Sequence, residues 1–117
     1  MEKFVLYDYR AAYFYNYSFA EIIDGCLKIS GEYSDRYLKT EVGNDPIEIH
    51  TYLFDKANTE QFISLIQESG QPLEGFLSKL FSQEFYSIFH DMRKLCAAND
   101  IEYEYTIART SNSIRTD

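Results

Sequence analysis

The sequence predicts an α+β protein in which helices pack on one face of a mainly antiparallel sheet. Up to residue 54, apolar and aromatic side chains recur at every second position, which is typical of strands. Between residues 58 and 99 the apolar spacing changes to three and four residues, which is typical of amphipathic helices. The alternation then returns, so the predicted order is ββββ-ααα-β. Strands followed by helices favour an α+β class over an alternating α/β fold.

Four strands are predicted in the first half because aromatic residues favour extended structure. They are expected at residues 3–9, 13–19, 26–33 and 47–54. The third strand places Leu27 and Ile29 on one face and Glu32 on the other. A charged connection from Ser34 to Pro46 separates the third strand from the fourth, and its Gly43-Asn44-Asp45-Pro46 run predicts a turn.

Three helices are predicted from stripes of apolar residues along one face and from residues that are typical of helix ends. Asn58 is the expected N-cap of the first helix, and Gly70 suits the position after its last turn. Pro72 is expected at the first position of the second helix, Ser82 as the cap of the third and Asn99 at its end. The second helix has the clearest stripe, formed by Leu73, Phe76, Leu77, Leu80 and Phe81.

The last strand is expected from Ile101 to Ala108, where Ile101, Tyr103, Tyr105 and Ile107 share one face. It should return to the sheet, because on its own that face would stay exposed to water. The length of 117 residues predicts one domain, which we expect to span residues 1–108. Residues 109–117 are polar and aperiodic and are expected to form a frayed tail.

The formal net charge is −8, and the excess of acids is concentrated in one part of the chain. Residues 32–75 contain nine acidic and three basic residues. Negative charge repels phosphate backbones and anionic lipid, so direct binding to nucleic acid or membrane is disfavoured. A basic protein is the favoured partner.

The two cysteines, Cys26 and Cys96, are expected to be buried free thiols, because a disulfide scaffold would need more cysteines at closer spacing. No basic region followed by an apolar one opens the chain, so no signal peptide is expected. Polar residues interrupt the apolar stretch from Ala11 to Ile23, which is therefore no membrane span. The predicted compartment is the cytosol.

The sequence contains no catalytic signature, so a role other than catalysis is predicted. The two histidines, His50 and His90, have no second ligand at the spacing of a metal site. No glycine-rich phosphate loop and no nucleophile elbow is present, and no cofactor is expected. Glu102 and Glu104 share a strand face, and such pairs are more often solvated than catalytic.

A partner-binding surface is predicted where tyrosines alternate with carboxylates in and around the charged connection. Tyrosine provides a large contact area at low entropic cost, and carboxylates steer association with a basic partner. The alternative is a solvated loop whose acids only keep the protein soluble. The predicted partner-binding residues are Glu32, Tyr33, Asp35, Tyr37, Glu41, Asp45 and Glu48.

Parts of the chain resemble small bacterial immunity proteins of polymorphic or contact-dependent toxin systems. The stretches are LKISGEYSD (Leu27 to Asp35), IEIHTYLFDKANTEQFISLI (Ile47 to Ile66), and the spaced residues Phe85, Phe89, Cys96, Ile101, Tyr103 and Tyr105. The resemblance implies a cytosolic antitoxin that blocks the active site of a cognate toxin. Such toxins are often nucleases with a basic groove, in agreement with the acidic composition.

Two other functions are consistent with the sequence. In one, exposed tyrosines pack against a second copy, so that the protein is a homodimer or an adaptor module. In the other, His50, tyrosines and carboxylates assemble a small active site only in three dimensions. This enzyme would require a deep pocket that holds a histidine or carboxylate with a perturbed pKa.

Overall fold

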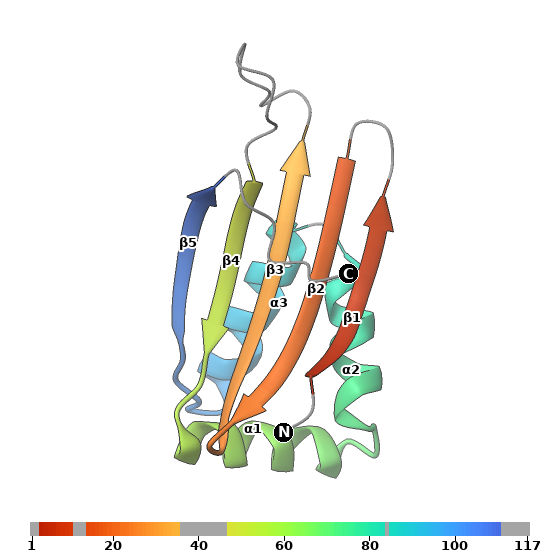
Figure 1. Ribbon diagram of the computed structural model, residues 1–117. Helices are drawn as coiled ribbons and strands as arrows, with labels where there is room; N and C mark the ends of the chain where they lie inside the picture. Colours follow the sequence, from red (N-terminus) through yellow and green to blue (C-terminus); the bar gives the residue numbers. More distant parts are fainter. Residues whose placement is uncertain (1–2, 11–13, 36–46, 84, 111–117) are drawn as a thin grey trace.

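The computed structural model describes residues 3–10, 14–35, 47–83 and 85–110. It confirms the α+β class and the order ββββ-ααα-β (Figure 1). The elements are β1 (Lys3–Arg10), β2 (Phe14–Ile23), β3 (Cys26–Asp35), β4 (Ile47–Leu53), α1 (Lys56–Glu68), α2 (Leu73–Phe81), α3 (Phe85–Ala98) and β5 (Glu104–Thr110). None of the helices in the described part of the chain is both long and apolar enough to cross a membrane.

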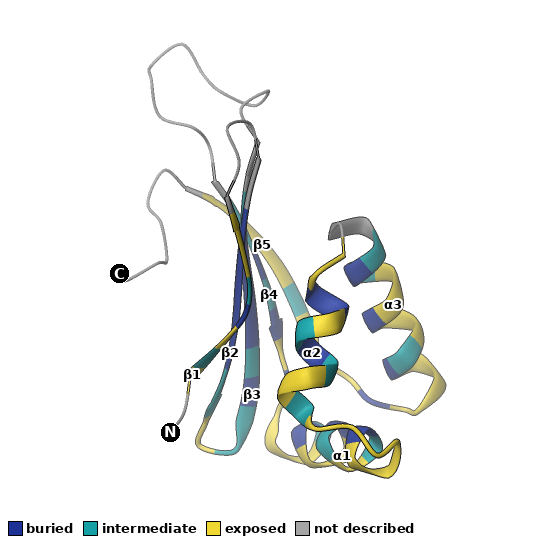
Figure 2. Cartoon of the chain, turned by 90° about the vertical axis from the view of Figure 1, so that its right-hand side faces the viewer, coloured by how far each residue is buried: buried dark blue, intermediate teal, exposed yellow. Residues whose placement is uncertain are grey.

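The five strands form one antiparallel sheet in the order β1-β2-β3-β4-β5. The three helices connect β4 to β5 and all lie on the same side of the sheet (Figure 2). As predicted, the last strand returns to the sheet and pairs with β4, with Tyr105 opposite Tyr52. It runs to Thr110, two residues beyond its expected end at Ala108. The rest of the predicted tail, residues 111–117, lies outside the described residues.

The helix-facing side of the sheet carries the aromatic core. Tyr52 meets Phe81 of α2 edge-on at 5.9 Å between ring centroids, and Phe54 lies 4.9 Å from Phe62 of α1. All four side chains are fully or almost fully buried. Burial of each such side chain contributes about 1.5–3 kcal/mol relative to exposure. Tyr52 of β4 therefore holds α2 on the sheet, and Phe54, directly after β4, holds α1.

The alternation predicted for the first strand is interrupted. The register between β1 and β2 shifts between Val5 and Tyr7, which is the mark of a β-bulge. Val5 lies opposite Phe19, and Tyr7 lies opposite Ser18 on the other face of β2. Val5 and Tyr7 therefore lie on different faces, contrary to the simple alternation of the sequence.

The helix ends differ from the prediction at two positions. The N-cap of α1 is Asp55, whose carboxylate accepts the backbone N–H of Asn58 at 2.8 Å, so Asn58 is not the cap. The Asn58 side chain instead accepts the backbone N–H of Glu102 at 2.8 Å. Ser82 ends α2 by donating its hydroxyl to the Lys79 carbonyl and does not cap α3.

The other end signals are close to their predicted places. Gly70 adopts a φ of 82° directly after the Ser69 C-cap of α1, a conformation that costs little only for glycine. Pro72 stands at the N-cap of α2, one residue before the predicted position. α3 ends at Ala98, just before Asn99.

Both cysteines are free thiols, although only Cys96 is fully buried, and Cys26 is half-buried. Burial raises the pKa of the Cys96 thiol to about 11. Its sulfur lies 3.9 Å from the Met92 sulfur inside α3. At neutral pH Cys96 is therefore a protonated core residue with little thiolate reactivity.

Candidate functional site

The predicted partner-binding residues do not form one surface in the described part of the chain. Tyr37, Glu41 and Asp45 lie outside the described residues, as does the side chain of Asp35. Glu32 is 0% exposed, so its carboxylate is not on the protein surface. Tyr33 and Glu48 are half-buried, lie opposite each other on β3 and β4, and point to the other face of the sheet from Glu32.

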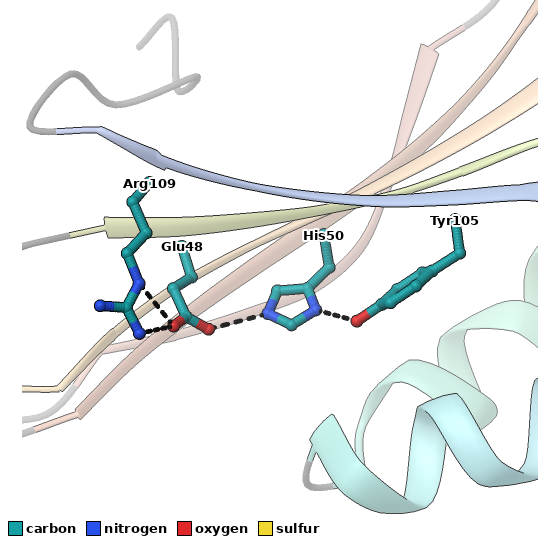
Figure 3. Close-up of polar contacts among 4 residues, drawn as sticks. All are labelled: Glu48, His50, Tyr105 and Arg109. Atoms are coloured by element: carbon teal, nitrogen blue, oxygen red, sulfur yellow. Dashed lines mark hydrogen bonds and ion pairs between the residues drawn. The ribbon is translucent and has the colours of Figure 1, made fainter.

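Tyr33 and Glu48 belong to a polar network on the helix-facing side of the sheet, with His50 at its centre. His50 Nδ1 lies 2.5 Å from the Tyr105 hydroxyl, and His50 Nε2 lies 3.1 Å from Glu48 Oε1 (Figure 3). Arg109 donates from Nε and Nη2 to Glu48 Oε2 at 3.1 and 2.8 Å. The Tyr33 ring meets the His50 ring edge-on at 4.9 Å between centroids.

This geometry fixes the protonation of His50. The Glu48 carboxylate can only accept, so Nε2 carries the proton and Nδ1 accepts the Tyr105 hydroxyl. Burial lowers the pKa of the imidazole, against the opposing effect of Glu48, and favours its neutral form. Burial raises the pKa of the Tyr105 hydroxyl to about 12, which keeps it a donor.

The carboxylate of Glu48 stays ionised. Its partial burial raises the pKa, but hydrogen bonds from His50 and Arg109 outweigh that effect and bring the pKa below its ordinary value. Both ring nitrogens of His50 are thus engaged within the protein, and the side chain is only 2% exposed. The network therefore links β4 to β5 through side chains in addition to the backbone pairing.

Gly31 makes room for this network. It lies opposite His50 in unbroken pairing, and a Cβ atom there would be 2.9 Å from the Tyr33 ring. Pairing of β3 with both β2 and β4 is regular through Gly31, so this glycine marks neither a turn nor a bulge. Any side chain at position 31 would have to displace the ring of Tyr33, which lies across its own strand.

We therefore expect Gly31→Ala to lower the free energy of unfolding by about 1–2 kcal/mol, the usual cost of overpacking. Urea denaturation measures this loss. In a Tyr33→Ala background the new methyl group meets no ring, so the same substitution should be neutral or stabilising. An equal loss in both backgrounds would show that the Tyr33 ring is not what requires glycine.

A second feature is an acidic end, which three segments form together: the turn at Asp24-Gly25, residues 55–68 and residues 99–104. The stem of Lys56 lies beside Gly25, and the backbone N–H of Glu102 is bound by Asn58. These contacts bring together exposed acids that are far apart in sequence. They are Asp24, Asp55, Glu60, Glu68, Asp100, Glu102 and Glu104, against one base in the three segments, Lys56.

A groove of about 470 Å³ lies within the acidic end. Leu53, Tyr103 and Cys26 contribute apolar surface to it, the fully buried Phe54 lies beneath them, and Asp55, Asn58, Glu102 and Glu104 contribute polar atoms. Leu53 is 40% exposed. Apolar surface beside carboxylates matches the two parts of an arginine or lysine side chain, a hydrocarbon stem and a cationic head.

Two aspects of these sites were missed in the sequence. Glu102 and Glu104 were interpreted as ordinary solvated acids, because their proximity to α1 arises only from tertiary contacts. The Glu48–His50 and Tyr105–Arg109 pairs each have even spacing, which places each pair on one strand face. That spacing is a usable signal, but only when β4 is already known to pair with β5.

No metal site is visible in the described ranges: no group of three or more histidine, cysteine, aspartate or glutamate residues there is placed to bind an ion. No protein-family model, curated protein or solved structure matches the chain.

Proposed function

We propose that this protein binds a basic protein partner through its acidic end and neutralises that partner, in the manner of an immunity protein that blocks a cognate toxin. The observation that carries the proposal is the set of seven exposed carboxylates around α1, against the single base Lys56 in the same segments. The groove among them offers apolar contact next to charge, the combination found at binding hot spots.

The charge distribution suits a partner whose own functional surface is positive, such as a nuclease with a basic substrate groove. Clustered carboxylates steer such a partner and raise its association rate, an effect that salt screens. A lysine or arginine of the partner would place its stem against Leu53 and Tyr103 and its head near Glu102 and Glu104. The proposed compartment is the bacterial cytosol, where a toxin of the same cell would act.

Two variants with equal charge change test this proposal and locate the interface. One carries Glu60→Lys, Glu102→Lys and Glu104→Lys at the acidic end. The other carries Asp35→Lys, Glu41→Lys and Asp45→Lys in the segment that the sequence predicted. The probe is the protein that the tagged wild-type chain captures from a lysate of its native host at low salt, after identification and purification.

The acidic-end variant should bind the captured protein at least about tenfold more weakly, mainly through a slower association rate with a smaller salt dependence. The other variant should stay within about twofold of wild type. Co-expression should protect cells from the captured protein when the chain is wild type but not when it carries the acidic-end substitutions. Unchanged affinity in the acidic-end variant, or loss only in the second variant, would reject the acidic end as the interface.

A further inference from the structure

A groove of about 490 Å³ between α2 and α3 belongs neither to the acidic end nor to the His50 network. Phe76 and Leu80 of α2 and Leu95 and Ala98 of α3 contribute its apolar surface. At one end Gln83 donates to the Leu80 carbonyl at 3.2 Å and to the Asp91 carboxylate at 3.3 Å. The two helices are thus linked at that end, while apolar side chains between them remain accessible.

The charge at this groove is opposite to that of the whole chain. Among the described residues, Lys79 and Lys94 line it against one acid, Asp91, which accepts a hydrogen bond from Gln83 and keeps its charge, so the lining has an excess of one positive charge. Both lysines are exposed. In a protein of net charge −8, two ammonium groups beside an apolar groove form a local site for a ligand with an apolar body and an anionic head.

The dimensions favour a small ligand over a protein segment. α2 has nine residues and is therefore about 14 Å long. The groove volume lies in the range of small-molecule sites, about 300–1,000 Å³. A stable protein interface buries about 800 Å² on each partner, which a groove of this length does not supply alone.

We propose that the α2–α3 groove binds a single-chain amphiphile with an anionic head group, such as a fatty-acid carboxylate. The chain lies against Phe76, Leu80 and Leu95, and the head pairs with the ammonium groups of Lys79 and Lys94. This site is independent of the acidic end and goes beyond the proposed neutralising function.

Two amphiphiles with the same chain and opposite head groups test the proposal: dodecanoate and dodecyltrimethylammonium, each kept below its micelle concentration. Non-specific adsorption to a protein of charge −8 would favour the cation, whereas binding in the proposed site favours the anion. The order of the two affinities therefore distinguishes specific binding from adsorption. Titrations of the 15N-labelled protein should show saturable 1:1 binding of dodecanoate, at least about tenfold tighter than the cation. The amide shift changes should be confined to α2 and α3.

Two double variants with the same charge change test whether Lys79 and Lys94 bind the head group. Lys79→Glu with Lys94→Glu should weaken dodecanoate binding by about tenfold, as expected for two partly exposed ion pairs. Lys56→Glu with Arg93→Glu, at exposed positions that do not line the groove, should change it by less than about twofold. Lys79→Gln with Lys94→Gln repeats the test with less disturbance of the helix ends.

Three results would overturn the proposal. The first is equal or tighter binding of the cation. The second is a set of dodecanoate-induced shifts outside α2 and α3, or no saturable binding at all. The third is a concentration-dependent shift of α2 and α3 amides without any amphiphile, which would identify a second copy of the chain as the occupant.

Discussion

Replacing Phe62 with alanine should lower the free energy of unfolding by about 3–5 kcal/mol, the usual range for a buried phenylalanine. The side chain is 0% exposed, and its ring lies 4.9 Å from the ring of Phe54. The Phe54 ring in turn lies 5.4 Å from the Tyr103 ring, measured between centroids, so the new cavity would open between α1 and the residues that follow β4 and precede β5. Small domains are stable by about 5–15 kcal/mol, so this loss is a large fraction of the total.

The loss should be large because few other groups attach α1 to the sheet. Ile66 is the next buried apolar residue on α1, and the Thr59 hydroxyl accepts the backbone N–H of Leu27 at 2.9 Å. Equilibrium urea denaturation followed by far-UV circular dichroism measures the change. Phe62→Leu should fall between wild type and Phe62→Ala, because it leaves a smaller cavity.

Gln61→Ala is the matched control, since Gln61 precedes Phe62 on the same helix and is exposed. It should change the stability by less than about 0.5 kcal/mol. A loss below about 1 kcal/mol for Phe62→Ala would contradict this view of the core. Similar losses in Phe62→Ala and Gln61→Ala would point to helix propensity as the cause rather than to packing.

The class and order of elements could be predicted because periodicity is a local property of the chain. Residues such as Phe62 and Ile66 reveal a helix face by spacing alone, and both are buried as that spacing requires. The caps were harder, because Asp55 and Asn58 are both suitable N-cap residues three positions apart. The choice between them depends on where β4 ends, which spacing does not specify to within one turn.

The candidate sites were less predictable because they depend on which segments meet. Alternation correctly placed Glu32 on the opposite face of β3 from Ile29, away from the helices, and Glu32 was therefore expected on the surface. Its side chain is nevertheless 0% exposed, and the spacing of the strand gives no sign of that burial. The acids at positions 60 and 102 lie in different thirds of the chain and form one surface only because α1 contacts the segment before β5.

The stability of the protein should fall as the pH is lowered from about 7.5 to 5.5, and His50 should be the main cause. Burial lowers the pKa of His50 in the folded protein, whereas the unfolded chain takes up a proton near the ordinary value of about 6.5. The unfolded state therefore binds more protons in this range, and the free energy of unfolding rises with pH. For one such group the slope reaches at most about 1.4 kcal/mol per pH unit.

His50→Ala should abolish this slope and lower the stability at pH 7.5 by about 2–4 kcal/mol. The substitution removes a side chain that is 1% exposed and takes away the hydrogen-bond partner of the Tyr105 hydroxyl. The contribution of Glu48 is separable, because its pKa is also lowered and its stabilisation is lost only in more acidic solution, as the pH falls below about 4.5.

The only other histidine, His90, is exposed on α3 and gives the matched control. His90→Ala should keep the slope that comes from His50 and stay within about 0.5 kcal/mol of wild type at pH 7.5. In the wild-type protein, 15N spectra of the imidazole should show the proton of His50 on Nε2, as its contact with Glu48 requires. A proton on Nδ1 alone would contradict the hydrogen bonds of His50 to Glu48 and Tyr105, and the link between β4 and β5 would then rest on backbone pairing and the Glu48–Arg109 ion pair. A pH slope that survives in His50→Ala would mean that the burial of His50 is not its cause.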